Sequence, residues 1–110
     1  MIFVTGPLWA GKETYIRRTL GWDEGDFKAR AVRDVQDLVP CEDLTALADR
    51  LAVKEVVIAT ELGGGVVPVD PAVRRKREEA GRLACLLSGR ADTVIRVCCG
   101  LPQVLKGERP

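Results

Sequence analysis

The sequence contains no histidine. Histidine is the side chain that proteins use most often as a general base near neutral pH and as a metal ligand, and it also forms covalent intermediates. Any such chemistry in this chain has to rest on other side chains. Covalent catalysis through a phosphorylated or nucleotidylated histidine is excluded.

Cysteine is scarce and is not spaced like a metal site. The chain has Cys41, Cys85, Cys98 and Cys99, and no two of them form a C-x-x-C pair. Zinc and iron–sulfur sites are usually built on such pairs. We therefore interpret the cysteines as reduced core residues rather than as metal ligands or disulfides.

Long apolar runs and an excess of charge are also missing. A membrane-spanning helix needs about 20 apolar residues in a row, and no run in this sequence approaches that length. The 17 basic and 16 acidic residues leave a formal charge of +1, so no general attraction to nucleic acid or to a membrane is expected. The N-terminus is a strand-like run before a glycine turn and does not resemble a signal peptide. A cytoplasmic location is the default expectation.

Strand-like and helix-like segments alternate along the 110 residues, a length that suits one domain. Apolar runs predict strands at 2–5, 56–60 and 93–99, with a weaker candidate at 29–35. Helical spacing and capping residues predict helices at 12–20, 44–51 and 72–88. Residues 22–28 are expected to be irregular, and 100–110 to form a polar tail. This alternation favours an α/β fold with a small, mainly parallel sheet over residues 1–110.

A glycine-rich segment lies between the first predicted strand and the first predicted helix. It reads GPLWAGKET and fits the phosphate-loop pattern G-x-x-x-x-G-K. In such a loop, backbone N–H groups and the helix N-terminus face phosphate oxygens, and the lysine reaches the outer phosphates. The alternative is a strand-to-helix turn without a ligand. We predict a three-layer, RecA-like P-loop domain whose nucleotide contacts include Gly6, Trp9, Ala10, Gly11, Lys12, Glu13 and Thr14, with Lys12 catalytic.

The residue after Lys12 departs from the pattern. P-loops carry Ser or Thr there, and the hydroxyl coordinates magnesium, but this chain has Glu13. Three interpretations stay open: Glu13 binds Mg²⁺ directly, Thr14 supplies the hydroxyl, or metal-supported catalysis is lost. If Glu13 does not bind metal, its charge repels the phosphates. Trp9 either stacks on the base or packs against the loop.

A second glycine cluster follows the predicted strand at 56–60. Ligands bind at the carboxyl ends of parallel strands, so this loop and the first one are expected to face one pocket. Glu61 is a candidate catalytic and Mg²⁺-binding residue, or caps a turn. Gly63 and Gly65 let the backbone approach the nucleotide, or only permit a turn.

Two arginines on the following helix are candidates for the same ligand. Arg74 and Arg77 lie on one side of a helical wheel. The alternative for Arg74 is an i,i+4 pair with Glu78, of the kind that decorates exposed helices.

Three motifs occur in a fixed order from Glu61 to the tail. They are ATELGGGVVP, the set Arg74, Arg77, Glu78, Gly81 and Arg82, and Gly100-x-Pro102 before Leu105-Lys106. They are similar to N-E-V-G-x-G-I-V-P, R-x-x-R-D-x-x-G-R-x-N-Q and G-x-P-x-x-L-K in the bifunctional adenosylcobinamide kinases and adenosylcobinamide-phosphate guanylyltransferases of cobalamin biosynthesis. The opening IFVTGPLWAGK also resembles this family, whereas the middle of the chain does not match. Thr60 replaces the asparagine of the first motif.

The resemblance implies an ATP- or GTP-binding protein that uses Mg²⁺, forms homo-oligomers and transfers a phosphoryl group to a corrinoid or another small hydroxyl acceptor. Family members are longer, and the part without a counterpart here holds the histidine that takes up the guanylyl group and a second acidic strand end. Guanylyltransferase activity by the histidine route is therefore excluded. A kinase-type phosphotransferase and a non-catalytic nucleotide-binding or scaffold relative both stay open. A pure oligomerisation module would leave the loop glycines and Lys12 without a purpose.

Overall fold

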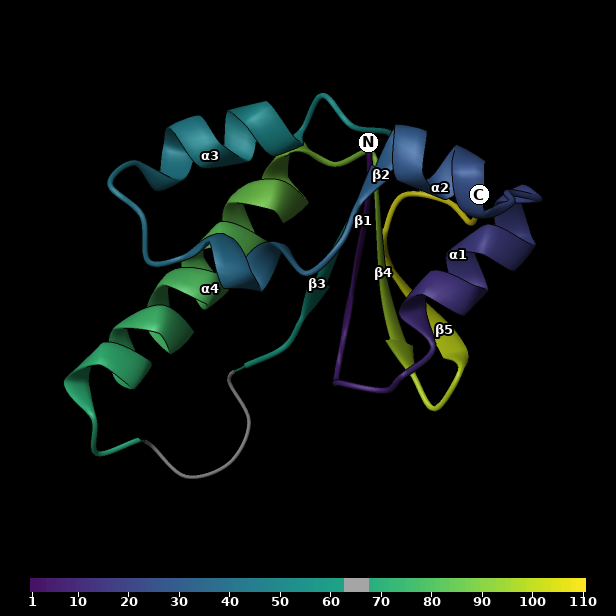
Figure 1. Ribbon diagram of the computed structural model, residues 1–110. Helices are drawn as coiled ribbons and strands as arrows, with labels where there is room; N and C mark the ends of the chain where they lie inside the picture. The colour runs from purple at the N-terminus through teal and green to yellow at the C-terminus, as the bar shows by residue number, and fades with distance from the viewer. Residues whose placement is uncertain (63–67) are drawn as a thin grey trace.

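The computed structural model describes residues 1–62 and 68–110, and in these ranges strands and helices alternate along most of the chain. Figure 1 shows their arrangement. The elements are β1 (Ile2–Gly6), α1 (Lys12–Leu20), α2 (Glu24–Arg30), β2 (Ala31–Val32), the 3₁₀ helix η1 (Val35–Leu38), α3 (Leu44–Leu51), β3 (Val56–Thr60), α4 (Pro71–Arg90), β4 (Thr93–Cys98) and β5 (Leu101–Lys106). None of the described helices is long and apolar enough to cross a bilayer.

The described strands form one sheet in the order β2-β3-β1-β4-β5. β1 is the central strand and runs parallel to both β3 and β4, and β2 runs parallel to β3. Only β5 is antiparallel to its neighbour, β4. The predicted α/β fold with a mainly parallel sheet is therefore confirmed.

Two expectations about single segments were wrong, and a third was right only in part. Residues expected to be irregular form α2, because the Asp23 and Asp26 side chains and backbones make a reciprocal capping box. The expected polar tail contains β5, whose side chains are mostly exposed and which is held by the β4 ladder. The weak strand candidate shortens to β2, only two residues long.

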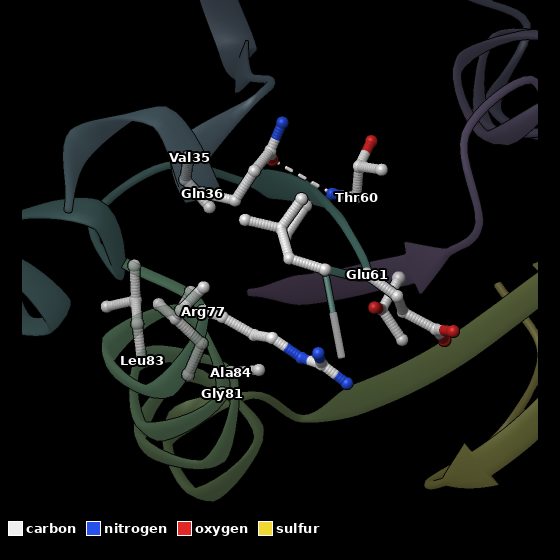
Figure 2. Close-up of a pocket in the computed structure, with 13 residues that line it drawn as sticks. Val35, Gln36, Thr60, Glu61, Arg77, Gly81, Leu83 and Ala84 are labelled. Atoms are coloured by element: carbon white, nitrogen blue, oxygen red, sulfur yellow. Dashed lines mark hydrogen bonds between the residues drawn. The ribbon is translucent and has the colours of Figure 1, made fainter. Parts of the chain in front are cut away.

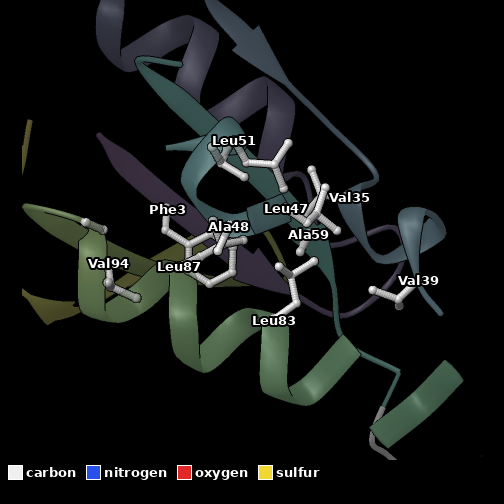
Figure 3. Packing of buried hydrophobic residues seen from close by; sticks show 12 residues of the cluster. Phe3, Val35, Val39, Leu47, Ala48, Leu51, Ala59, Leu83, Leu87 and Val94 are labelled. Atoms are coloured by element: carbon white, nitrogen blue, oxygen red, sulfur yellow. The ribbon is translucent and has the colours of Figure 1, made fainter. Parts of the chain in front are cut away.

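Side chains alternate between two hydrophobic clusters, one on each face of the sheet. On the face covered by α3 and α4, Phe3 and Val57 pack with Leu83 and Leu87 (Figure 3). The opposite cluster packs α1 and α2 against the sheet through Val4, Ile16, Phe27, Ile58 and Ile95. Because both faces are covered, β3 is buried at every position. Each fully buried large apolar side chain contributes about 1.5–3 kcal/mol.

The cysteines are free, as interpreted, but they are not core residues. Cys85 and Cys99 are exposed, and Cys41 and Cys98 are half-buried. Cys99 follows β4 and lies in a tight turn with a φ of 54°, where the chain reverses before β5. The apolar pattern around Cys98 and Cys99 therefore reports on strand formation and not on full burial.

Gly6 lets the end of β1 pass close to β4. Its φ is 154°, and a Cβ at this position would lie 2.1 Å from the carbonyl oxygen of Val97. Its own carbonyl accepts a hydrogen bond from the Glu61 N–H at 2.9 Å. Since the contact at Val97 is with backbone, no side chain can turn away to make room. Only glycine fits beside the Val97 carbonyl, and the chain can therefore leave the sheet at this position.

Replacing Gly6 with alanine should therefore destabilise the fold by more than about 1 kcal/mol. Gly89→Ala is the matched control, because Gly89 lies in α4 and a Cβ there meets no atom within 4 Å. Alanine in a helix interior is favoured over glycine by about 0.5–1 kcal/mol. Urea unfolding followed by circular dichroism should give opposite signs for the two variants. Equal stability changes would contradict the steric argument.

Glu79 connects α4 to the segment before α3. Its carboxylate accepts a hydrogen bond from the Cys41 N–H at 3.0 Å and another from Arg75 Nε at 2.7 Å. The Cys41 N–H, and then Arg75, lower the pKa of Glu79 below its ordinary value. Both bonds favour the ionised carboxylate.

Because the pKa of Glu79 is lower in the folded than in the unfolded state, its contribution to stability is present above its ordinary value of 4.5 and is lost as the pH falls through the folded value. Glu79→Gln should flatten the loss of stability on acidification. Glu78→Gln, a change at the exposed neighbouring carboxylate, should leave that slope nearly as in the parent. Urea midpoints measured from pH 7 to pH 3 test this, and parallel slopes for parent and Glu79→Gln would refute it.

Candidate functional site

The loop from Gly6 to Lys12 emerges at the carboxyl end of the central strand. Gly11 caps α1 in the left-handed conformation with a φ of 85°. Lys12, the first residue of α1, is 8% exposed. Its Nζ donates to the carbonyl oxygens of Pro7 at 2.7 Å and Gly6 at 3.3 Å. The ammonium group thus lies inside the curve of its own loop.

Two carboxylates from other strand ends act electrostatically on Lys12. Burial lowers the pKa of the Lys12 ammonium, and the charges of Asp34 and Glu61 act in the opposite direction. Both acidic groups are therefore close enough to favour the charged lysine. The structure brings three elements, β1, β2 and β3, to one charged centre.

Asp34 lies two residues after the end of β2 and was not among the predicted site residues. It lines the same open cavity of about 350 Å³ as Trp9, Gly11 and Lys12. Its Oδ1 accepts a hydrogen bond from Gln36 Nε2 at 3.4 Å. The sequence analysis assigned the second acidic strand end to the part of the family without a counterpart here, but Asp34 occupies such a position. Because β2 is only two residues long, no strand pattern in the sequence marks the position of Asp34.

Glu13 forms an ion pair with Arg33. The Glu13 Oε1 lies 2.7 Å from Arg33 Nη1, and both residues line the cavity. Glu13 stands where the pattern G-x-x-x-x-G-K-[S/T] has Ser or Thr, and the positive charge of Arg33 offsets its negative charge. Thr14 also lines this cavity and is exposed.

Glu61 is held by an arginine that the sequence analysis did not single out. Arg96 of β4 donates to both carboxylate oxygens of Glu61, at 2.7 Å and 3.0 Å. A paired geometry of this kind fixes the orientation of the carboxylate. The signal in the sequence was the single charge within the apolar run of β4.

The other residues predicted to contact the nucleotide do not all line one cavity. Trp9 is 91% exposed and lines the cavity beside Lys12, as do Ala10 and Gly11. Arg77 lies with Glu61 in a second cavity, shown in Figure 2. Arg74 is exposed on α4 and lines neither cavity. The predicted contacts at Gly63 and Gly65 lie outside the described residues.

Within residues 1–62 and 68–110, no group of three or more Asp, Glu, Cys and His side chains is arranged to hold a metal ion. Magnesium in phosphoryl-transfer sites is usually bound by one or two carboxylates together with substrate phosphates and water. Asp34 beside Lys12 fits such a site, because it offers carboxylate oxygens next to the place where phosphates would lie.

The sequence matches the model of a known protein family. No curated protein matches the chain. The sequence model of the family described as cobinamide kinase / cobinamide phosphate guanyltransferase matches residues 27–105. This match includes Asp34, Glu61 and α4, and it extends over the middle of the chain, where no resemblance was expected. The Gly6–Lys12 loop lies before the matched residues. The chain therefore belongs to the cobinamide kinase / cobinamide phosphate guanyltransferase family.

Proposed function

We propose that this chain binds a purine nucleoside triphosphate, ATP or GTP, beside Lys12 and transfers its terminal phosphoryl group to the hydroxyl of a corrinoid acceptor in cobalamin biosynthesis. The observation that carries the proposal is the buried Lys12 ammonium, enclosed by its loop and flanked by Asp34 and Glu61. The loop would then be a P-loop, and the domain a three-layer, RecA-like fold. The family to which the chain belongs supports kinase chemistry.

Lys12 would neutralise charge on the outer phosphates. Its present partners are two carbonyl oxygens, which are weaker partners for an ammonium group than phosphate oxygens are. The N-terminus of α1 begins at the same residue and contributes a favourable potential for an anion. Positioning and charge stabilisation of this kind supply most of the catalysis in phosphoryl transfer.

Mg²⁺, when bound, would neutralise negative charge on the phosphates. Asp34 is the carboxylate best placed to hold it, because it lines the cavity together with Lys12 and contacts an amide rather than an arginine. We propose as further Mg²⁺ ligands Thr14, Glu13 and Glu61. Glu61 and Glu13 would have to bind metal while paired with Arg96 and Arg33, or exchange those partners. For Glu61 we favour a role in positioning groups around the phosphates.

The Glu13–Arg33 pair explains how a carboxylate is tolerated next to a phosphate site. Without Arg33, the repulsion between Glu13 and each phosphate charge at about 5 Å would be on the order of 3 kcal/mol at an effective dielectric of about 20. With the guanidinium at 2.7 Å, the two charges form a nearly neutral unit. The loop can therefore keep its affinity for phosphate without the usual hydroxyl.

Lys12→Ala should lower the affinity for ATP and GTP at least tenfold, which is about 1.4 kcal/mol. Lys54→Ala is the control, because Lys54 is exposed in the turn before β3, at the amino end of the sheet. Isothermal titration calorimetry with and without Mg²⁺ makes the measurement. Equal nucleotide affinities in Lys12→Ala and the parent would refute the assignment of the phosphate site. Binding without phosphorylation of cobinamide would favour the non-catalytic alternative.

Arg33→Ala should weaken nucleotide binding about threefold to tenfold, because it leaves the Glu13 charge uncompensated beside the phosphates. Adding Glu13→Ser to Arg33→Ala should recover most of that loss. The same calorimetric titration, repeated at low and high salt, provides the readout. Recovery argues for compensation of charge, whereas a double variant as weak as Arg33→Ala would mean that Arg33 itself binds phosphate.

A further inference from the structure

A second cavity of about 290 Å³ lies between the carboxyl end of β3, the helix η1 and α4. Figure 2 shows its lining residues from these three elements. α4 contributes the small residues Ala80, Gly81 and Ala84 to the wall, beside Arg77, Leu83 and Leu87. The volume is close to the lower end of the range for small-molecule sites, about 300–1,000 Å³.

The lining of this cavity changes character from one end to the other. Val35, Leu83 and Leu87 form an apolar interior. Glu61 and Arg77 lie at the other end, so that end of the cavity is lined by charged side chains (Figure 2). A matching ligand has an apolar body and a polar tip.

The cavity adjoins the one beside Lys12, and Thr60 lines both. The position of Thr60 is fixed, because its N–H donates to Gln36 Oε1 at 2.9 Å. Gln36 is itself buried and donates through Nε2 to Asp34. One glutamine therefore connects the shared wall to the carboxylate at the proposed metal site. A group bound in the second cavity near Thr60 would face the phosphates.

We propose that the second cavity binds the hydroxyl-bearing arm of the acceptor, an inference that rests on the proposed kinase function. A volume of about 290 Å³ is too small for a corrin macrocycle with its substituents, so the macrocycle stays outside and only the arm enters. The apolar part of the arm lies against Leu83 and Ala84, and its hydroxyl lies near Thr60.

The reaction is a single displacement. The hydroxyl oxygen of the arm forms a bond to the terminal phosphorus of the nucleotide. The bond from that phosphorus to the bridging oxygen breaks, and its electron pair leaves with the nucleoside diphosphate. The hydroxyl proton is released to solvent. The products are a phosphate monoester and a nucleoside diphosphate, and no histidine takes part.

Filling the cavity tests this assignment, with cobinamide as the probe. Ala84→Phe places a large ring in the cavity and should lower cobinamide affinity at least tenfold, while ATP and GTP affinities stay within twofold of the parent. Cys85→Phe is the matched control, because Cys85 is exposed on the same helix and does not line the cavity. It should bind both ligands like the parent. Circular dichroism verifies the fold.

If Ala84→Phe does not fold, Gly81→Leu decides, because a Cβ at Gly81 meets no atom within 4 Å. Unchanged cobinamide affinity in the filled variant would overturn the cavity assignment. A parent protein that binds nucleotide but not cobinamide would also overturn it, and the nucleotide site would stand. A third outcome is possible, in which the parent binds cobinamide but no nucleotide and the filled variant loses cobinamide binding. This result would support the cavity assignment and refute the proposed kinase function.

Discussion

The close approach of β1 to β4 at Gly6 is the constraint on which the rest of the structure depends. β1 lies between two parallel partners and is covered on both faces, so its direction is fixed along its whole length. At its end, only the missing side chain of Gly6 lets the backbone pass the Val97 carbonyl. The loop therefore leaves the sheet at the centre of its carboxyl edge. Lys12 turns back into that loop, and the ends of β2 and β3 meet it there.

Charge at this edge is balanced across long distances in sequence. Glu13 pairs with Arg33 from the end of β2, and Glu61 pairs with Arg96 from β4. Each carboxylate is held by an arginine from another strand region, which leaves Lys12 and Asp34 as the pair facing the open cavity. A lysine and a carboxylate that face the same cavity suit a site for a phosphate chain and a divalent cation, because the cation and the lysine are both needed to neutralise the phosphates.

The two cavities share a wall, which is the arrangement that the proposed kinase function needs. Phosphoryl transfer needs the acceptor oxygen in line with the bond that breaks, so donor and acceptor must share a wall. Thr60 supplies that shared wall at the end of β3. The family match covers β3, α4 and β4, which carry most of the second cavity, while the glycine loop lies outside it. Membership of the family and the proposed phosphate site therefore rest on different parts of the chain.

The sequence by itself determined the features whose physics is local. β-branched runs set β1 and β3, Asp70 and Pro71 set the start of α4, and the glycines with Lys12 predicted the loop. Tertiary structure alone decided what depends on partners far away in the chain. β2 has two residues and β5 is largely exposed, so neither carries a recognisable pattern without the neighbouring strand that holds it. Asp34, Arg33 and Arg96 belong to the site because the sheet order brings strand ends together across separations of 20 and 35 residues, and no local pattern encodes that order.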